Sequence, residues 1–180
     1  MFENHLFDVV KPSVRLQYEL VEESNVIKIL KIFKENDNPY VTEDYKDLKK
    51  LKNYYNYMQE LRTSQSKHAG HDWLIKLKDT QTYVGVISIY ELSRETIKDN
   101  DRKFTLGFAI GNAYHRNYYA TEAIIHFFDF VKDVLGRSLV LAYTQDGNKP
   151  SKLLFQKLGF EDVTDKYMGG PDMRFYHLEI

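Results

Sequence analysis

The sequence predicts an α/β fold in which helices flank one mixed sheet. Segments whose apolar residues alternate are interspersed with segments whose apolar residues recur every three to four positions, as strands and amphipathic helices require. A strongly apolar helix pattern also lies between two strand patterns, at 103–110 and 139–143, and such a crossover makes these strands parallel. With 180 residues and no linker or internal repeat, the chain is expected to form a single domain over residues 1–180.

The first third of the chain predicts one strand and two helices. Apolar and polar residues alternate over 14–20, as in a half-buried strand. A helix follows from a cap at Ser24 or Asn25, because the apolar residues at positions 26, 29, 30 and 33 form one stripe. An Asn- and Pro-containing run ends this helix, and a second helix is expected over about 42–62.

A hairpin and a further strand occupy the middle of the chain. Strands are expected at 73–77 and 82–90, because both segments alternate and a short polar break joins them. The polar segment 91–101 then connects this hairpin to a strand at 103–110.

The last third alternates helices with strands. Residues 121–135 carry a broad apolar face, which predicts a helix packed on the sheet. The apolar run 139–143 suits a strand that is buried on both faces. Pro150 fits the first turn of a helix that Gly159 ends, and an alternating strand at 173–180 closes the sheet.

Composition excludes several classes of protein. A net charge of −1 lacks the basic excess of a general nucleic-acid binder. Without cysteine there can be no disulfide, zinc–thiolate site or cysteine nucleophile, and we interpret His68 and His71 as an exposed loop pair rather than metal ligands. No apolar run approaches a membrane span, and the first residues lack the features of a signal peptide. We therefore expect a cytoplasmic protein with no metal, membrane or nucleic-acid partner.

A short cationic loop precedes the helix at 121–135. Its residues are His115, Arg116, Asn117, Tyr118, Tyr119 and Ala120, followed by Thr121. The free backbone N–H groups of a helix N-terminus and the positive end of the helix dipole favour a phosphate group. The loop is therefore a candidate phosphate site, and an ordinary helix start that binds nothing is the alternative interpretation.

A second fragment follows the next strand and runs from Asn148 through Ser151 to the sequence Lys157-Leu158-Gly159-Phe160. Asn148 can cap the helix at Pro150, or its side chain can contact a ligand. Ligands in sheets with parallel strands lie beyond the C-terminal strand ends. Both fragments are therefore expected near one ligand site, close to Ile110 and Tyr143.

Together the two fragments resemble the GNAT superfamily of acyl-CoA-dependent N-acyltransferases, and most closely its ribosomal-protein N-terminal acetyltransferase branch. The loop of that branch reads W-G-K-G-Y-A-T-E-A, against H-R-N-Y-Y-A-T-E-A at 115–123 here. The resemblance implies a splayed, mostly antiparallel sheet, acetyl-CoA as the acyl donor and a primary amine as acceptor, either a protein N-terminus or a small amine. Tyr118 replaces a glycine of the family, so we expect the loop to approach the phosphates less closely.

The resemblance also assigns roles to individual residues. The backbone of Phe108, Ala109 and Ile110 would face the pantetheine arm, and residues 115–121 would hold the pyrophosphate. Asn148 and Phe155 would contact the cofactor. Many members carry a tyrosine acid for the thiolate where Phe155 stands here, so the acid role falls to Ser151, with ordered water as the alternative.

The general base has no clear candidate in the motifs. Family members often carry a glutamate where Thr105 stands, and Glu91 at the end of the preceding strand is the nearest alternative carboxylate. Thr105 and Phe155 leave open a second class of function, a catalytically silent acetyl-CoA sensor or interaction module. We predict the enzyme. Its acceptor is expected to be bound by the first helix pair, the connection at 91–102 and the final hairpin around 167–174. On the helix pair, Glu43, Asp44 and Asp47 can attract a cationic amine or merely be solvated.

Overall fold

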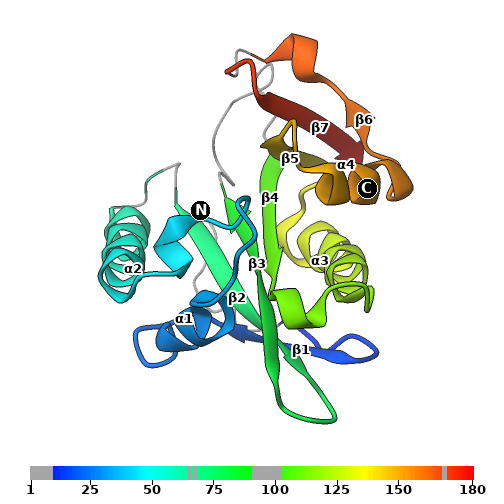
Figure 1. The fold of residues 1–180 in the computed structure, drawn as a ribbon. Helices are drawn as coiled ribbons and strands as arrows, with labels where there is room; N and C mark the ends of the chain where they lie inside the picture. Colours follow the sequence, from blue (N-terminus) through cyan, green and yellow to red (C-terminus); the bar gives the residue numbers. More distant parts are fainter. Residues whose placement is uncertain (1–9, 65, 67–68, 91–102, 168–169) are drawn as a thin grey trace.

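The computed structural model describes residues 10–64, 66, 69–90, 103–167 and 170–180. In these segments seven strands form one mixed sheet in the order β1-β2-β3-β4-β5-β7-β6, flanked by helices, which confirms the predicted fold class (Figure 1). The elements are β1 (Leu16–Leu20), α1 (Ile27–Phe33), η2 (Glu43–Tyr45), α2 (Leu48–Thr63), β2 (Gly70–Leu77), β3 (Tyr83–Tyr90), β4 (Lys103–Ile110), η3 (Asn112–Tyr114), α3 (Tyr119–Leu135), β5 (Leu139–Gln145), α4 (Lys149–Lys157), β6 (Glu161–Asp162), η4 (Thr164–Lys166) and β7 (Met173–Glu179).

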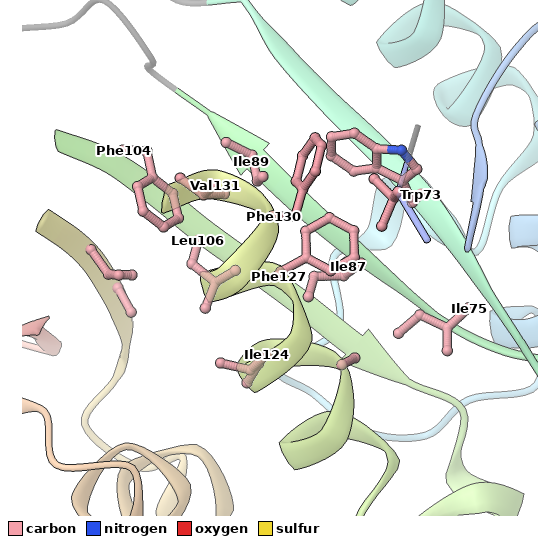
Figure 2. Close-up of a cluster of buried hydrophobic side chains, with 14 of the residues drawn as sticks. Trp73, Ile75, Ile87, Ile89, Phe104, Leu106, Ile124, Phe127, Phe130 and Val131 are labelled. Atoms are coloured by element: carbon pink, nitrogen blue, oxygen red, sulfur yellow. The ribbon is translucent and has the colours of Figure 1, made fainter. Parts of the chain in front are cut away.

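Each face of the sheet has its own apolar cluster. Helices α1 and α2 cover one face through residues such as Phe33 and Leu51, and α3 and α4 cover the other (Figure 1). In the second cluster the Trp73 ring on β2 meets Phe127 and Phe130 of α3, with ring centroids 5.1 and 5.9 Å apart (Figure 2). The apolar face expected for α3 is thus the face that packs on the sheet.

Two helix starts differ from the expectation. Asn25 does not cap α1, because its side chain donates to the Leu20 carbonyl at 2.8 Å and accepts from the Glu22 N–H at 2.8 Å. It therefore fixes the turn after β1 instead. The helix expected over 42–62 is divided into η2 and α2, because the Asp47 carboxylate accepts a hydrogen bond from the Lys50 N–H at 2.9 Å and starts a new helix there.

Strands β4 and β5 are parallel, as the crossover predicted, but they remain together only briefly. Their pairing joins Lys103 to Leu139, Phe104 to Val140 and Thr105 to Leu141. Beyond this point β4 continues along β3 as far as Ile110, while β5 continues along β7 as far as Gln145. The sheet therefore opens at its centre.

The opening does not arise from a bulge near Asn112. The register of β3 with β4 is continuous over 105–110, and Asn112 lies beyond the strand in η3, where its side chain donates a hydrogen bond to Asp37. The two strands separate because beyond residue 105 β4 stays paired with β3, whereas beyond residue 141 β5 stays paired with β7.

A polar contact fixes β1 to the first turn of α3. The Glu122 carboxylate accepts hydrogen bonds from the Ser13 hydroxyl, the Arg15 N–H and the Arg15 Nε, each at 2.7 Å. The Arg15 guanidinium also lies 4.8 Å from the centre of the Tyr119 ring. The glutamate of the A-T-E-A sequence therefore positions the start of α3 on the sheet.

We expect the substitution Glu122→Gln to lower the free energy of unfolding by about 1–2 kcal/mol at neutral pH, since it weakens hydrogen bonds to a charged acceptor. Burial raises the pKa of Glu122, but hydrogen bonds from Arg15 and Ser13 outweigh burial and hold this pKa below its usual value. The carboxylate thus stabilises the fold above its unfolded-state pKa, and this contribution is lost as the pH falls through the folded-state pKa.

Urea denaturation of both proteins at neutral and at acidic pH measures this difference. It should be present at neutral pH and shrink towards zero in acid. The matched control is Asp133→Asn, an exposed carboxylate on the same helix, which should leave the stability unchanged at both pH values. A Glu122→Gln difference that does not depend on pH would contradict the assignment.

Candidate active site

A cavity of about 260 Å³ lies where the sheet opens. Its walls come from the separated parts of β4 and β5, from the first turns of α4 and from three side chains of other elements. The lining residues are Tyr40, Tyr90, Thr105, Leu106, Gly107, Phe108, Tyr143, Thr144, Gln145, Asn148, Ser151, Phe155 and Met173. Among the described residues, β4 is paired with β5 only up to Thr105. The next residues of β4, Leu106 to Phe108, border this cavity without a strand partner on that side.

The loop before α3 has an unusual backbone. Arg116 and Tyr118 both have φ near +63°, in the left-handed region that favours glycine. Tyr118 immediately precedes the helix, so the chain keeps a glycine-type conformation with a tyrosine at a cost of roughly 1–2 kcal/mol. The Asn117 side chain stabilises the loop by donating to the carbonyls of Tyr114 and His115, at 3.1 and 3.0 Å.

This backbone leaves a row of donors available. The first hydrogen bond of α3 runs from the Glu122 N–H to the Tyr118 carbonyl, at 3.0 Å. Within the described parts of the chain, the N–H groups of residues 116–121 donate to no carbonyl or side chain. The side chain of Tyr118 is 72% exposed and does not cap them. The N-terminus of α3 therefore presents several free donors and the positive end of its dipole.

His115 differs from its neighbours in this loop. Its N–H donates to the Asn112 carbonyl at 3.3 Å, and its ring Nε2 lies 2.9 Å from the Ile110 carbonyl. Both groups are engaged within the protein. His115 therefore fixes the exit of β4, and the row of free donors begins one residue later, at Arg116.

The second fragment forms the far wall of the cavity. Asn148 caps α4, because its Oδ1 accepts from the Ser151 N–H at 3.3 Å, and its Nδ2 donates to the Thr144 hydroxyl at 2.9 Å. The helix-cap interpretation is thus confirmed, and the same side chain lines the cavity. Phe155 is 2% exposed and packs edge-on to Phe108, so it belongs to the core as well as to the cavity wall.

The remaining sequence candidates lie in different places. Phe108 lines the cavity, whereas Ala109 and Ile110 lie further along β4 towards the loop. Glu91 lies outside the described residues. Of the two histidines that were expected in an exposed loop, His68 lies outside the described residues, and His71 is instead buried in β2. Burial and the nearby Arg62 guanidinium lower the pKa of His71 to about 3.

A second cavity of about 530 Å³ lies on the α1–α2 side. Most of its lining comes from η2 and α2, and it shares three residues with the first cavity. The lining residues are Thr42, Asp44, Tyr45, Tyr54, Tyr57, Met58, Leu61, Tyr90, Thr105 and Tyr143. The shared residues are Tyr90, Thr105 and Tyr143, so the two cavities meet next to the point where β4 and β5 separate.

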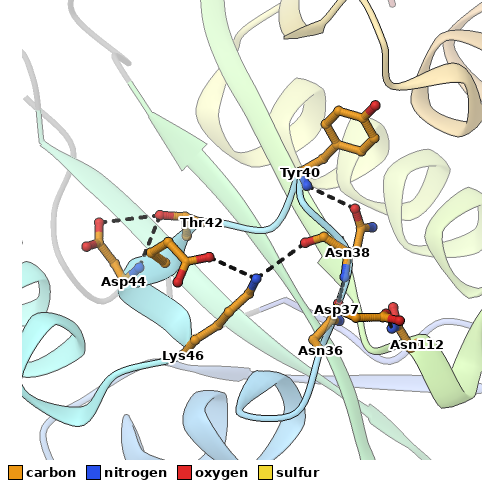
Figure 3. Close-up of polar contacts among 9 residues, drawn as sticks. Asn36, Asp37, Asn38, Tyr40, Thr42, Asp44, Lys46 and Asn112 are labelled. Atoms are coloured by element: carbon orange, nitrogen blue, oxygen red, sulfur yellow. Dashed lines mark hydrogen bonds and ion pairs between the residues drawn. The ribbon is translucent and has the colours of Figure 1, made fainter.

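The segment from Asn36 to Lys46 contributes to both cavities, through Tyr40 to the first and through Asp44 to the second. Polar contacts within the segment hold these residues (Figure 3). The Asn38 side chain accepts from the Tyr40 N–H at 3.0 Å, and the Asp44 N–H donates to the Thr42 hydroxyl at 3.3 Å. A Cβ at Gly147 would lie 2.7 Å from the Tyr40 hydroxyl, so this glycine allows the loop to approach the β5–α4 turn.

Neither a metal site nor a membrane-spanning helix is found among the described residues. No group of three or more His, Asp or Glu side chains in these segments is arranged to hold a metal ion. No helix in the same segments is long and apolar enough to cross a membrane.

Solved structures share this architecture at low sequence identity. A nucleotide-linked sugar GNAT enzyme, FdhC, superposes with a TM-score of 0.71 at 17% identity, over 93% of this chain and 88% of that chain. A putative ribosomal-protein-serine acetyltransferase from Vibrio cholerae gives 0.69 at 16% identity, over 93% and 95%. The ribosomal L7/L12 alpha-N-protein acetyltransferase RimL, in complex with coenzyme A, gives 0.70 at 12% identity, over 95% and 97%.

No curated protein matches the sequence. The sequence does match one family of proteins. The family described as the acetyltransferase (GNAT) domain matches residues 15–161, which hold both fragments, the loop before α3 and strands β4 and β5. The chain therefore belongs to the GNAT family of acetyltransferases and is an acyl-CoA-dependent N-acetyltransferase.

Proposed function

We propose that this enzyme transfers the acetyl group of acetyl-CoA to a primary amine, either a protein N-terminus or a small amine. The observation that carries the proposal is the separation of β4 from β5 after Thr105 and Leu141. This separation places an unpaired strand edge, a cavity and the free donors at the start of α3 along one side of the sheet.

The described residues fit the acyl donor at both of its ends. The N–H groups of residues 116–121 suit the pyrophosphate, and Arg116 adds a positive charge beside them. The backbone of β4 beyond Thr105 suits the amide-bearing pantetheine arm, because an extended chain can pair with an open strand edge. In this arrangement the thioester lies near Thr105, where the two cavities meet.

Ser151 is our candidate for the proton donor to the departing thiolate. It lies in the first turn of α4 and lines the first cavity. Within the described residues its hydroxyl forms no hydrogen bond, so its proton is available, whereas Phe155 on the same wall has none to give. Asn148 orients this turn through the Ser151 N–H.

The second cavity is our candidate for the acceptor site. It adjoins the first cavity at Tyr90, Thr105 and Tyr143, so an amine there would reach the thioester from the α1–α2 side. The structural neighbours named above act on different acceptors, a nucleotide-linked sugar and ribosomal proteins. The fold alone therefore does not determine which acceptor the enzyme uses. We infer that the residues lining the second cavity determine it.

Release of free thiol from acetyl-CoA, measured with a panel of amines and N-terminal peptides, tests the proposed reaction. We expect turnover with at least one primary amine and a product heavier by one acetyl group in mass spectrometry. Tight coenzyme A binding without turnover across a broad panel would instead support a silent binding module.

For Ser151→Ala we expect kcat to fall by about 100-fold, the effect typical of a lost general acid, with coenzyme A affinity nearly unchanged. Thiol release under saturating substrates measures kcat, and calorimetric titration measures the affinity. Ser24→Ala, at an exposed serine before α1, is the control and should change neither value. An unchanged kcat in Ser151→Ala would assign the proton to water.

Two substitutions at Asn148 separate capping from cofactor contact. Asn148→Ala removes the cap and should cost about 0.5–2 kcal/mol of stability, whereas Asn148→Asp keeps a cap acceptor and should cost little. We expect both to weaken coenzyme A binding, because both lose the amide donor that faces Thr144 and the cavity. Calorimetric titration with coenzyme A measures this. Weaker binding in the alanine variant alone would limit the role of Asn148 to capping.

A further inference from the structure

A buried carboxylate lies beneath the second cavity. Asp72, on β2, is 2% exposed. Its oxygens accept hydrogen bonds from the Ser88 hydroxyl, from the Tyr90 hydroxyl at 3.0 Å and from the Tyr54 hydroxyl at 3.0 Å. Ser88 lies opposite Asp72 on β3, and Tyr54 reaches it from α2. Of these residues, Tyr54 and Tyr90 line the second cavity directly.

Among the described residues, the hydrogen-bond partners of the Asp72 carboxylate are neutral hydroxyls. In the segments that the structure describes, no lysine or arginine forms an ion pair with Asp72. Burial, and after it the charge of Asp72, raises the pKa values of Tyr54 and Tyr90, so both hydroxyls stay protonated. A buried charge without a counter-charge is costly, and hydrogen bonds from hydroxyls offset only part of that cost.

The two tyrosine hydroxyls also face each other. Their oxygens are 3.0 Å apart, and each lies within hydrogen-bond distance of Asp72. When both hydroxyls donate to the carboxylate, neither has a proton left for the contact between them, and the neighbouring Tyr45 hydroxyl, which interacts with Tyr90, is neutral as well. An ammonium group in the cavity supplies what this arrangement lacks, because it carries three donors and a positive charge.

The sheet is built to hold the Tyr90 ring in this place. A Cβ at Gly107 would lie 3.0 Å from the ring, and one at Gly70 only 2.2 Å from it. Gly70 is opposite Tyr90 on β2, and Gly107 is opposite Ser88 on β4. Two glycines on neighbouring strands thus leave the room that the ring occupies between Asp72 and the cavities.

The rest of the cavity lining favours a cation as well. Tyr45, Tyr57 and Tyr143 add aromatic rings, whose faces attract cations. Asp44 adds a carboxylate, and neither lysine nor arginine is among the described residues that line this cavity. Met58 and Leu61 supply apolar surface for the carbon chain of an amine.

We propose that the hydroxyls of Tyr54 and Tyr90, held and polarised by Asp72, form an ammonium subsite that makes this enzyme select as its acceptor a primary amine that arrives as its ammonium ion and loses one proton to solvent before it attacks the thioester. The inference rests on the proposed acetyl transfer and adds the charge of the acceptor. Tyr54 and Tyr90 touch the acceptor, and Asp72 is a positioning residue that acts through them.

The test uses n-butylammonium chloride as the probe and 1-butanol as its uncharged counterpart, with binding followed by saturation-transfer NMR on the full-length chain. We expect butylammonium to bind the wild-type protein more tightly than butanol does. Asp72→Asn should weaken butylammonium binding about 10- to 100-fold, because the variant loses the negative charge that attracts the ammonium group, and should leave butanol binding unchanged. Tyr54→Phe, which removes only a hydroxyl, should weaken butylammonium binding severalfold. This variant serves as the test if Asp72→Asn does not fold.

Matched controls remove similar groups outside the cavity. Asp79→Asn takes an exposed carboxylate from the β2–β3 turn, and Tyr55→Phe takes a hydroxyl from the residue next to Tyr54. Neither should change butylammonium binding. With a turned-over amine, Asp72→Asn should raise the KM for the amine far more than the KM for acetyl-CoA, a difference that general destabilisation would not produce.

Butylammonium affinity that is equal in the wild-type protein and in Asp72→Asn or Tyr54→Phe would overturn the subsite. The subsite would also be overturned if the wild-type protein bound butanol as tightly as butylammonium, or if it did not bind butylammonium at all. Coenzyme A affinity is measured on the same samples. If butylammonium binding fails the test while coenzyme A still binds, only the ammonium subsite is refuted. If coenzyme A does not bind either, the proposed function is refuted.

Discussion

The backbone hydrogen bonding of β4 is the constraint on which the rest of the structure depends. One edge of β4 is paired with β3 from Thr105 to Ile110, but the other edge is paired with β5 over only three residues, 103–105. Backbone N–H and C=O groups near the interior of a protein require partners. A ligand that is itself an extended chain of amides can supply them, which is why the open edge, the adjoining cavity and the free donors of α3 are best understood together.

Contacts between distant segments hold this opening in place. Glu122 ties the start of α3 to residues 13 and 15, and the loop at 36–46 brings Tyr40 against Gly147 on the opposite side of the first cavity. Asp72 organises the floor of the second cavity through Tyr54 and Tyr90. Because each contact joins different elements or distant segments of the chain, the cavities are features of the packed fold and not of any one loop.

Local signals in the sequence were enough to predict part of this arrangement. The cap at Asn148, the strand at 103–110 and the helix after the cationic loop depend on neighbouring residues, and the structure has all three. Asn25 was mistaken for a helix cap, because its partners lie in the preceding strand. The Glu122 contact joins residues more than a hundred positions apart, and the Asp72 cluster depends on the register of β2 with β3. Neither the Glu122 contact nor the Asp72 cluster produces a local pattern in the sequence, so both can be found only from the folded structure.

We propose that the amides of residues 116–121 and the open edge of β4 hold the acyl donor. The most direct measurement is a titration of the isotope-labelled protein with coenzyme A, followed through its backbone amide resonances. We expect saturable shifts concentrated in residues 116–121 and 106–110, with little change in α1 and β1. Saturable binding that leaves both of these segments undisturbed would contradict it.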